Sequence, residues 1–181
     1  MIITETKLKG CLILQPEIFE DSRGSFFEVF KKKEIEQYLG YTIDFVQENK
    51  SISHKGVLRG LHFQTGEAAQ AKLVSVQKGE VVDVIVDIRT NSKTFGEYIK
   101  VNLSDKNYTS VFIPRGMAHG FLSLTNEVIF TYLCDNYYNK EMESGILYND
   151  CDLAIDWNFP ESELVLSKKD MLLPRFKDLI K

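Results

Sequence analysis

One short segment of the sequence, residues 56–64 (GVLRGLHFQ), places a permanent cation and a titratable ring among strand-forming apolar residues. The first is Arg59 and the second is His62, and an imidazole can both take and give a proton. A polar side chain in a buried strand needs a partner or a function, because its desolvation is costly. Glycines at both ends of the VLR triplet indicate a bulge or a close backbone approach. The segment therefore predicts a polar site set into β-structure, where proton transfer is feasible.

A second histidine, His119, follows a predicted turn within residues 113–121 (IPRGMAHGF). Its proline and first glycine are turn residues, so His119 is expected at the lip of a strand that starts at Gly120. A lone histidine in an apolar strand is more often a hydrogen-bonded core residue, whereas two on neighbouring strands could bind a metal. Metal-binding cupins use a His-x-His pair, but glycine and glutamine stand two positions before and after His62. We therefore favour an acid–base site over a metal site.

Tyr132 and Lys72 have two interpretations each, and the local sequence does not separate them. Tyr132 is either a core aromatic with a bonded hydroxyl or a general acid lining a pocket. Lys72 leads an inward row on its strand, so its amine either reaches the rim or stabilises an oxyanion inside. Arg23, Arg59 and Lys169 could together hold a diphosphate, although each alone is more often a surface charge.

The elements that must position these residues are short strands separated by turn signals at 8–12 residue intervals, which is typical of an all-β sandwich or barrel. One helix is predicted over residues 31–39, with Gly40 at its C-terminal end, and a second short helix over residues 176–180. We expect one compact domain over residues 1–181, because the chain shows no linker, repeat or low-complexity tract. The predicted strands are residues 12–15, 25–30, 43–51, 57–64, 72–78, 80–88, 97–103, 111–113, 120–124 and 128–134.

Composition excludes several classes of partner. The 22 basic and 26 acidic residues give a net charge of −4, which argues against nucleic acid or an anionic membrane as the main partner. No apolar stretch approaches the length of a membrane span, and no export signal is apparent at the N-terminus. The three cysteines form no C-x-x-C pair, so neither a disulfide framework nor a zinc site is expected. We expect a cytoplasmic location.

Seven motifs occur in order along the chain: residues 21–28 (DSRGSFFE), 45–49 (FVQEN), 56–64 (GVLRGLHFQ), 71–74 (AKLV), 79–84 (GEVVDV), 113–121 (IPRGMAHGF) and 136–138 (NYY). Together they resemble the dTDP-4-dehydrorhamnose 3,5-epimerase family. The resemblance implies a jelly-roll, cupin-type β-barrel with a few short peripheral helices. It also implies a cofactor-independent isomerase that epimerises C3 and C5 of dTDP-4-dehydro-6-deoxyglucose through an enolate, in rhamnose and polysaccharide biosynthesis.

The resemblance assigns a role to individual residues. It implies that His62 is the base, that Asp170 orients its imidazole, that Tyr132 is the acid on the other face of the sugar, and that Lys72 steadies the enolate. Tyr138 would stack on the nucleotide base. The residues implied to hold the diphosphate and sugar are Arg23, Glu28, Gln47, Asn49, Arg59, His119, Glu143 and Lys169. The first two would come from the partner subunit, so the resemblance implies a homodimer that shares residues across its interface.

Arg59 and His62 are three positions apart and would point to opposite faces of a regular strand. If both enter one pocket, Gly60 must mark a bulge or a strong local twist. This is a prediction about local structure that depends only on the spacing.

Three other functions remain open. A relative could use the same base at only one carbon or on another nucleotide. The chain could be a metal-dependent cupin oxygenase, or a sugar-nucleotide binding module without catalysis.

Overall fold

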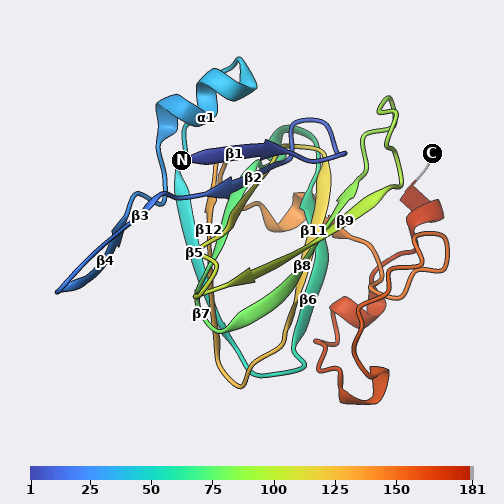
Figure 1. Ribbon diagram of the computed structural model, residues 1–181. Coiled ribbons are helices and arrows are strands. Elements are labelled where there is room, and N and C mark those ends of the chain that lie inside the picture. The colour runs from blue at the N-terminus through green and yellow to red at the C-terminus, as the bar shows by residue number, and fades with distance from the viewer. Residues whose placement is uncertain (180–181) are drawn as a thin grey trace.

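The computed structural model describes residues 1–179, which form two antiparallel sheets that face each other, with a projecting hairpin and one helix (Figure 1). The six-stranded sheet contains, in spatial order, β1 (Ile2–Glu5), β2 (Leu12–Gln15), β10 (Ser110–Ile113), β7 (Lys72–Lys78), β12 (Val128–Cys134) and β5 (Gln47–Ser53). The five-stranded sheet contains β13 (Glu143–Gly145), β6 (Leu58–Gln64), β11 (Met117–Ser123), β8 (Glu80–Asp87) and β9 (Tyr98–Ser104). The hairpin is β3 (Ile18–Asp21) with β4 (Gly24–Phe27).

Helical structure is peripheral. The helix α1 (Lys32–Leu39) buries Ile35 against the outer face of the six-stranded sheet. It ends because Gly40 adopts a left-handed conformation with φ 76° and donates its backbone N–H to the Glu36 carbonyl. Short 3₁₀ turns cover Gly66–Ala68, Lys140–Met142, Glu161–Glu163, Asp170–Leu172 and Phe176–Leu179.

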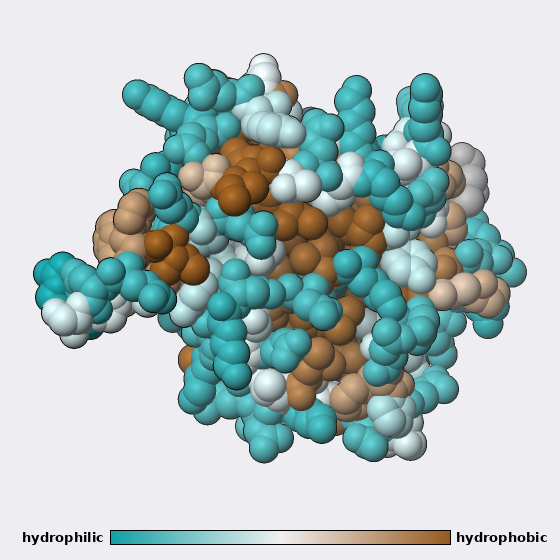
Figure 2. All heavy atoms as spheres, in the orientation of Figure 1, coloured by the Kyte–Doolittle hydropathy of each residue, from teal (hydrophilic) through white to brown (hydrophobic). Residues whose placement is uncertain are grey.

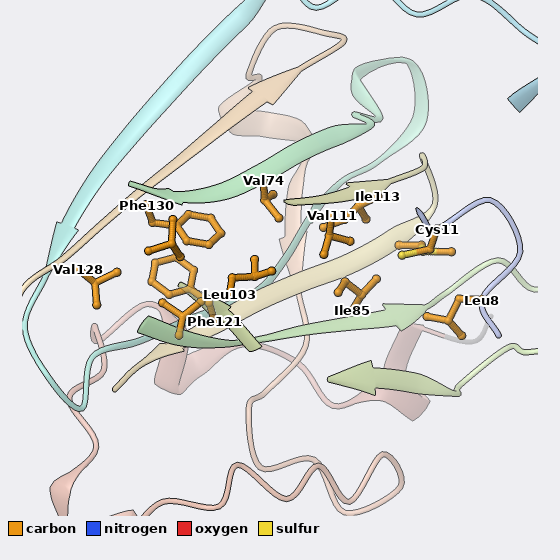
Figure 3. Close-up of a cluster of buried hydrophobic side chains, with 13 residues drawn as sticks. Leu8, Cys11, Val74, Ile85, Leu103, Val111, Ile113, Phe121, Val128 and Phe130 are labelled. Carbon is orange, nitrogen blue, oxygen red and sulfur yellow. The ribbon is translucent and has the colours of Figure 1, made fainter. Parts of the chain in front are cut away.

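The main core lies between the two sheets. Val74, Val111 and Phe130 point from the six-stranded sheet toward Ile85 and Phe121 of the five-stranded sheet (Figure 3). The rings of Phe121 and Phe130 stack with centroids 4.2 Å apart. Both rings also line a cavity, so the core and the cavity meet at this pair.

The chain after β13 folds over the outer face of the five-stranded sheet (Figure 1). Trp157 and Phe176 pack there on Val84 and Val86 of β8, and the Trp157 indole donates a hydrogen bond to the Tyr148 carbonyl (2.9 Å). Both faces of β8 are therefore buried, and its two aspartates point into the space between the sheets instead of into solvent.

The all-β prediction and the helix at residues 31–39 are confirmed, and β7 and β12 have the predicted bounds. The structure corrects other bounds. The strand expected over residues 43–51 is Gln47–Ser53, and the one expected over 120–124 begins at Met117. Strands β1, β3 and β13 were not predicted, because their pairing partners rather than their own apolar patterns define them. The terminal turn occupies Phe176–Leu179, and position 180 of the expected helix lies outside the described residues.

Apolar atoms form a tract across the middle of one face of the molecule and gather near the base of the projecting hairpin (Figure 2). The hairpin exposes two large aromatic side chains, with Phe19 at 51% and Phe26 at 68% exposure. Within residues 1–179, no helix has both the length and the apolar character needed to cross a membrane.

Candidate active site

A cavity of about 420 Å³ opens between the sheets, next to the Phe121–Phe130 stack. This volume falls in the range of small-molecule sites. Every residue proposed from the sequence for catalysis or binding lines it, except Arg23 and Glu28. The lining is Gln47, Asn49, Ser51, Arg59, His62, Phe63, Gln64, Gln70, Lys72, His119, Phe121, Phe130, Tyr132, Tyr138, Glu143, Ser167, Lys169 and Asp170.

An irregularity in β6 lets Arg59 and His62 face the same cavity. His62 is opposite His119 on β11 and Arg59 is opposite Phe121, so three steps along β6 match two along β11. Gly60 lies at this register shift with φ 137°, and a Cβ there would lie 2.5 Å from the Cα of Gly120. Only glycine fits, because the two strands are in backbone contact at this point. The predicted irregularity at Gly60 is confirmed.

His62 is held by a carboxylate from the C-terminal segment. Its Nε2 lies 2.6 Å from Oδ1 of Asp170, which is 4% exposed and sits in the 3₁₀ turn Asp170–Leu172. Burial raises the pKa of Asp170, but the interactions with His62, Ser167 and Lys169 together outweigh it, so the net pKa lies below the ordinary value. An ionised carboxylate only accepts hydrogen bonds, so Nε2 carries the hydrogen and Nδ1 of the neutral ring is the basic nitrogen.

His119 forms a second histidine–carboxylate pair beside the first. Its Nε2 lies 2.7 Å from Oδ1 of Asp83 on β8, and both side chains are buried. The expectation that His119 stands at the lip of a strand is wrong. It lies inside β11 as the cross-strand partner of His62, because β11 begins at Met117.

Tyr132 and Lys72 lie on adjacent strands of the opposite sheet. The Lys72 ammonium is 5.8 Å from the centroid of the Tyr132 ring. Burial lowers the pKa of Lys72 and raises the pKa of Tyr132, so the phenol keeps its proton at neutral pH. Lys72 lines the cavity, so its charge is available to a bound oxyanion.

The mouth of the cavity is polar and carries one exposed aromatic ring. Tyr138 is 50% exposed, and its hydroxyl donates to Oε2 of Glu143 (2.7 Å). Lys169 forms an ion pair with the same oxygen. Burial raises the pKa of Glu143, but the hydrogen bonds from Lys169 and Tyr138 outweigh it and the net pKa is lowered. On β5, Gln47 donates to Asn49 (3.0 Å).

Arg23 and Glu28 are away from this cavity. Arg23 lies at the tip of the β3–β4 hairpin, where its side chain is 88% exposed and pairs with Asp21 at 2.6 Å. Glu28 follows β4 and pairs with Lys31 at 2.5 Å. The structure of one chain therefore does not bring them to the site.

A model of the dTDP-4-dehydrorhamnose 3,5-epimerase family matches residues 5–178. The chain belongs to this family. The epimerase of Escherichia coli (strain K12) is 48% identical over 182 residues, covering 100% of this chain and 97% of its own. These matches confirm the resemblance drawn from the seven motifs.

Solved epimerase structures give the same result. The dTDP-4-dehydrorhamnose 3,5-epimerase of Elizabethkingia anophelis NUHP1 is 50% identical with a TM-score of 0.96, covering 99% of this chain and 98% of its own. The epimerase of Legionella pneumophila Philadelphia 1, solved in complex with dTDP-4-keto-L-rhamnose, is 47% identical with a TM-score of 0.93, covering 99% and 94%. These structures confirm the expected jelly-roll, cupin-like fold. They also confirm that the chain is an isomerase of the epimerase type.

Sequence reasoning gave no role to Ser51, which lines this epimerase cavity, or to Asp83, which is bonded to His119. The sequence did contain a signal for Asp83, because it is an acidic residue in the middle of the largely apolar strand Glu80–Asp87. Gln64 shares the face of His62 two positions away. Among the described residues, no three histidine, cysteine or acidic side chains are arranged to hold a metal ion.

Proposed function

We propose that the chain epimerises C3 and C5 of dTDP-4-dehydro-6-deoxyglucose, giving dTDP-4-dehydrorhamnose. The observation that carries the proposal is the His62–Asp170 pair, with 2.6 Å between Nε2 and Oδ1, in a cavity that Tyr132 and Lys72 also line. A base, an acid and a cation thus surround one space, which is what an enolate mechanism requires.

The chemistry is a proton exchange at carbon without change of oxidation state. The C4 ketone acidifies the hydrogens at C3 and C5, since the electron pair left behind delocalises onto the ketone oxygen. Nδ1 of His62 takes the proton, and the Lys72 ammonium stabilises the enolate oxygen. Tyr132 then gives a proton to the same carbon from the opposite face, which inverts the centre. Exchange with water returns the proton from His62 to solvent and restores the phenol.

The nucleotide would act as a handle that holds the sugar over the base. The polar residues of the cavity that would hold the diphosphate and sugar are Gln47, Asn49, Arg59, His119, Glu143 and Lys169. Tyr138 would stack its exposed ring on the base of the nucleotide. Binding energy from this remote part positions the reacting ring, which lowers the entropic cost of the reaction.

The proposal includes a homodimer in which Arg23 and Glu28 complete the partner's site. Support comes from the hairpin itself, which projects from the barrel and exposes Phe19 and Phe26 (Figure 1). Exposed aromatic rings on a projecting arm are typical of an interface. The proposed location is the cytoplasm, which agrees with three cysteines that are free thiols.

The test is proton exchange in deuterium oxide, followed by NMR of the dTDP-sugar. The protein should place deuterium at both C3 and C5, and His62→Ala should abolish this exchange while dTDP still binds. His54→Ala is the matched control, because His54 is exposed, does not line the cavity, and has its Nδ1 3.4 Å from the Asn126 carbonyl. Its exchange rate should equal that of the unmodified protein.

Each rival function predicts a different outcome. Deuterium at one carbon alone would show that the enzyme epimerises only that carbon. Binding of dTDP-sugar without any exchange would favour a binding module. Stoichiometric iron or manganese that is lost in His62→Ala would favour the metal-dependent oxygenase.

A further inference from the structure

Two glutamine side chains, one from each sheet, hold consecutive backbone N–H groups of the loop that carries Tyr138. The N–H of Tyr138 donates to Oε1 of Gln47 on β5 (3.0 Å). The N–H of Asn139 donates to Oε1 of Gln64 on β6 (3.1 Å). The loop therefore bridges the two sheets at the mouth of the cavity.

The orientation of both amides follows from the chemistry of their partners. A backbone N–H can only donate, so the oxygen of each glutamine must face the loop. The Gln47 amide is engaged on both sides, since its nitrogen donates to Asn49 (3.0 Å). Gln64 is 8% exposed, so a loss of its acceptor would leave the Asn139 N–H without a partner next to the cavity.

Little else restrains the ring of Tyr138. The ring is half exposed, and its hydroxyl bond to Glu143 fixes only the far end of the side chain. A loop residue with an exposed ring loses its position easily when its backbone is released. The hydrogen bonds from the Tyr138 and Asn139 N–H groups therefore set the position of the Tyr138 ring at the mouth of the cavity.

We propose that Gln64 is a positioning residue that holds Tyr138 in place for the base of the bound nucleotide. The inference rests on the proposed function, which gives Tyr138 that role. Gln64 acts through the Asn139 N–H and not by touching the reacting carbons. It should therefore affect nucleotide affinity and leave the chemical step unchanged.

The first experiment measures the dissociation constant of dTDP by calorimetry for Gln64→Met, which keeps the side-chain length and removes the acceptor. Loss of one hydrogen bond predicts about 3- to 10-fold weaker binding. KM for the dTDP-sugar should rise by the same factor, and kcat for exchange should stay within about twofold. Gln77→Met is the matched control, because Gln77 is exposed on β7, does not line the cavity, and donates to Ser75 and Thr131. It should bind dTDP as the unmodified protein does.

The second experiment repeats the substitution in a Tyr138→Ala background. If Gln64 acts through Tyr138, the additional loss of affinity should be under about twofold there. An equal loss in both backgrounds, an unchanged affinity in Gln64→Met alone, or a parallel fall in kcat would each overturn the inference. If Gln64→Met does not fold, Gln64→Asn withdraws the amide from the loop and gives the same comparison.

The proposed function fails on a different result. It fails if the unmodified protein shows no exchange or does not bind dTDP. The positioning role of Gln64 fails if the unmodified protein is active but the Gln64 variants give one of the three contrary results named above.

Discussion

Replacing Asp170 with asparagine tests whether its charge, and not only its shape, supports the base. The substitution keeps an oxygen that can accept from Nε2 of His62, which lies 2.6 Å away, but removes the negative charge. As His62 takes a proton from the sugar, the ring becomes positive. Two unit charges about 4 Å apart attract by about 4 kcal/mol at an effective dielectric constant of about 20.

Only part of that charge is present in the transition state. If between half and all of it has formed, the loss is about 2–4 kcal/mol, or an exchange rate about 30- to 1,000-fold lower. The assay is deuterium incorporation at saturating substrate, with Asp152→Asn as the control, because Asp152 is exposed and does not line the cavity. A rate for Asp170→Asn within threefold of the unmodified protein would refute the electrostatic role.

The same carboxylate makes stability depend on pH with a defined sign. Although burial alone would raise the pKa of Asp170, the interactions with His62, Ser167 and Lys169 together lower it below its unfolded value. Its contribution to stability is therefore full above the unfolded pKa of about 4 and is lost as the pH falls through the folded pKa. Asp170→Asn should remove this contribution, so urea titrations from pH 6 to pH 3 should show a smaller decline for the variant than for the unmodified protein.

Two further substitutions separate charge from packing. Lys72→Met should lower kcat by about 10²- to 10³-fold by removing the oxyanion partner. It should also raise the melting temperature at pH 7, because the lowered pKa of Lys72 marks a buried cation that costs stability below that pKa; an unchanged or lower melting temperature contradicts this. Gly60→Ala should lower the free energy of unfolding by about 2–5 kcal/mol in urea, since its Cβ would lie 2.5 Å from Gly120 Cα at φ 137°. A loss under 1 kcal/mol would mean that the strands separate easily.

The local sequence pattern was sufficient to predict those elements whose own residues define them. The helix Lys32–Leu39 was predictable from its apolar spacing and from Gly40, and the spacing of Arg59 and His62 was enough to require an irregularity at Gly60. Asp83 was missed for a physical reason. The C-terminal segment covers the outer face of β8 and Asp83 points inward, and no local pattern of the strand encodes that arrangement.

Asp170 illustrates what spacing alone cannot supply. It stands 108 residues after His62, and only the family motif linked the two, because no local pattern encodes a contact across that separation. The strand Glu143–Gly145 was missed for the same reason, since it exists only through its pairing with β6. The residues of the site were therefore accessible from motifs, whereas their partners required the tertiary structure.

The two histidine–carboxylate pairs differ in how their carboxylates are held, and this has a consequence for the base. His119 and His62 are cross-strand partners, but Asp83 belongs to a central strand of the sheet, whereas Asp170 belongs to a segment that only packs against it. That segment is anchored by Trp157 and Phe176 on the outer face of the five-stranded sheet. The tautomer of His62 is thus fixed by packing on the outer face of the sheet that carries it. Local opening of the C-terminal segment would remove the carboxylate without disturbing either sheet, so the activity of the base depends on a part of the chain that contributes no other group to the reacting carbons.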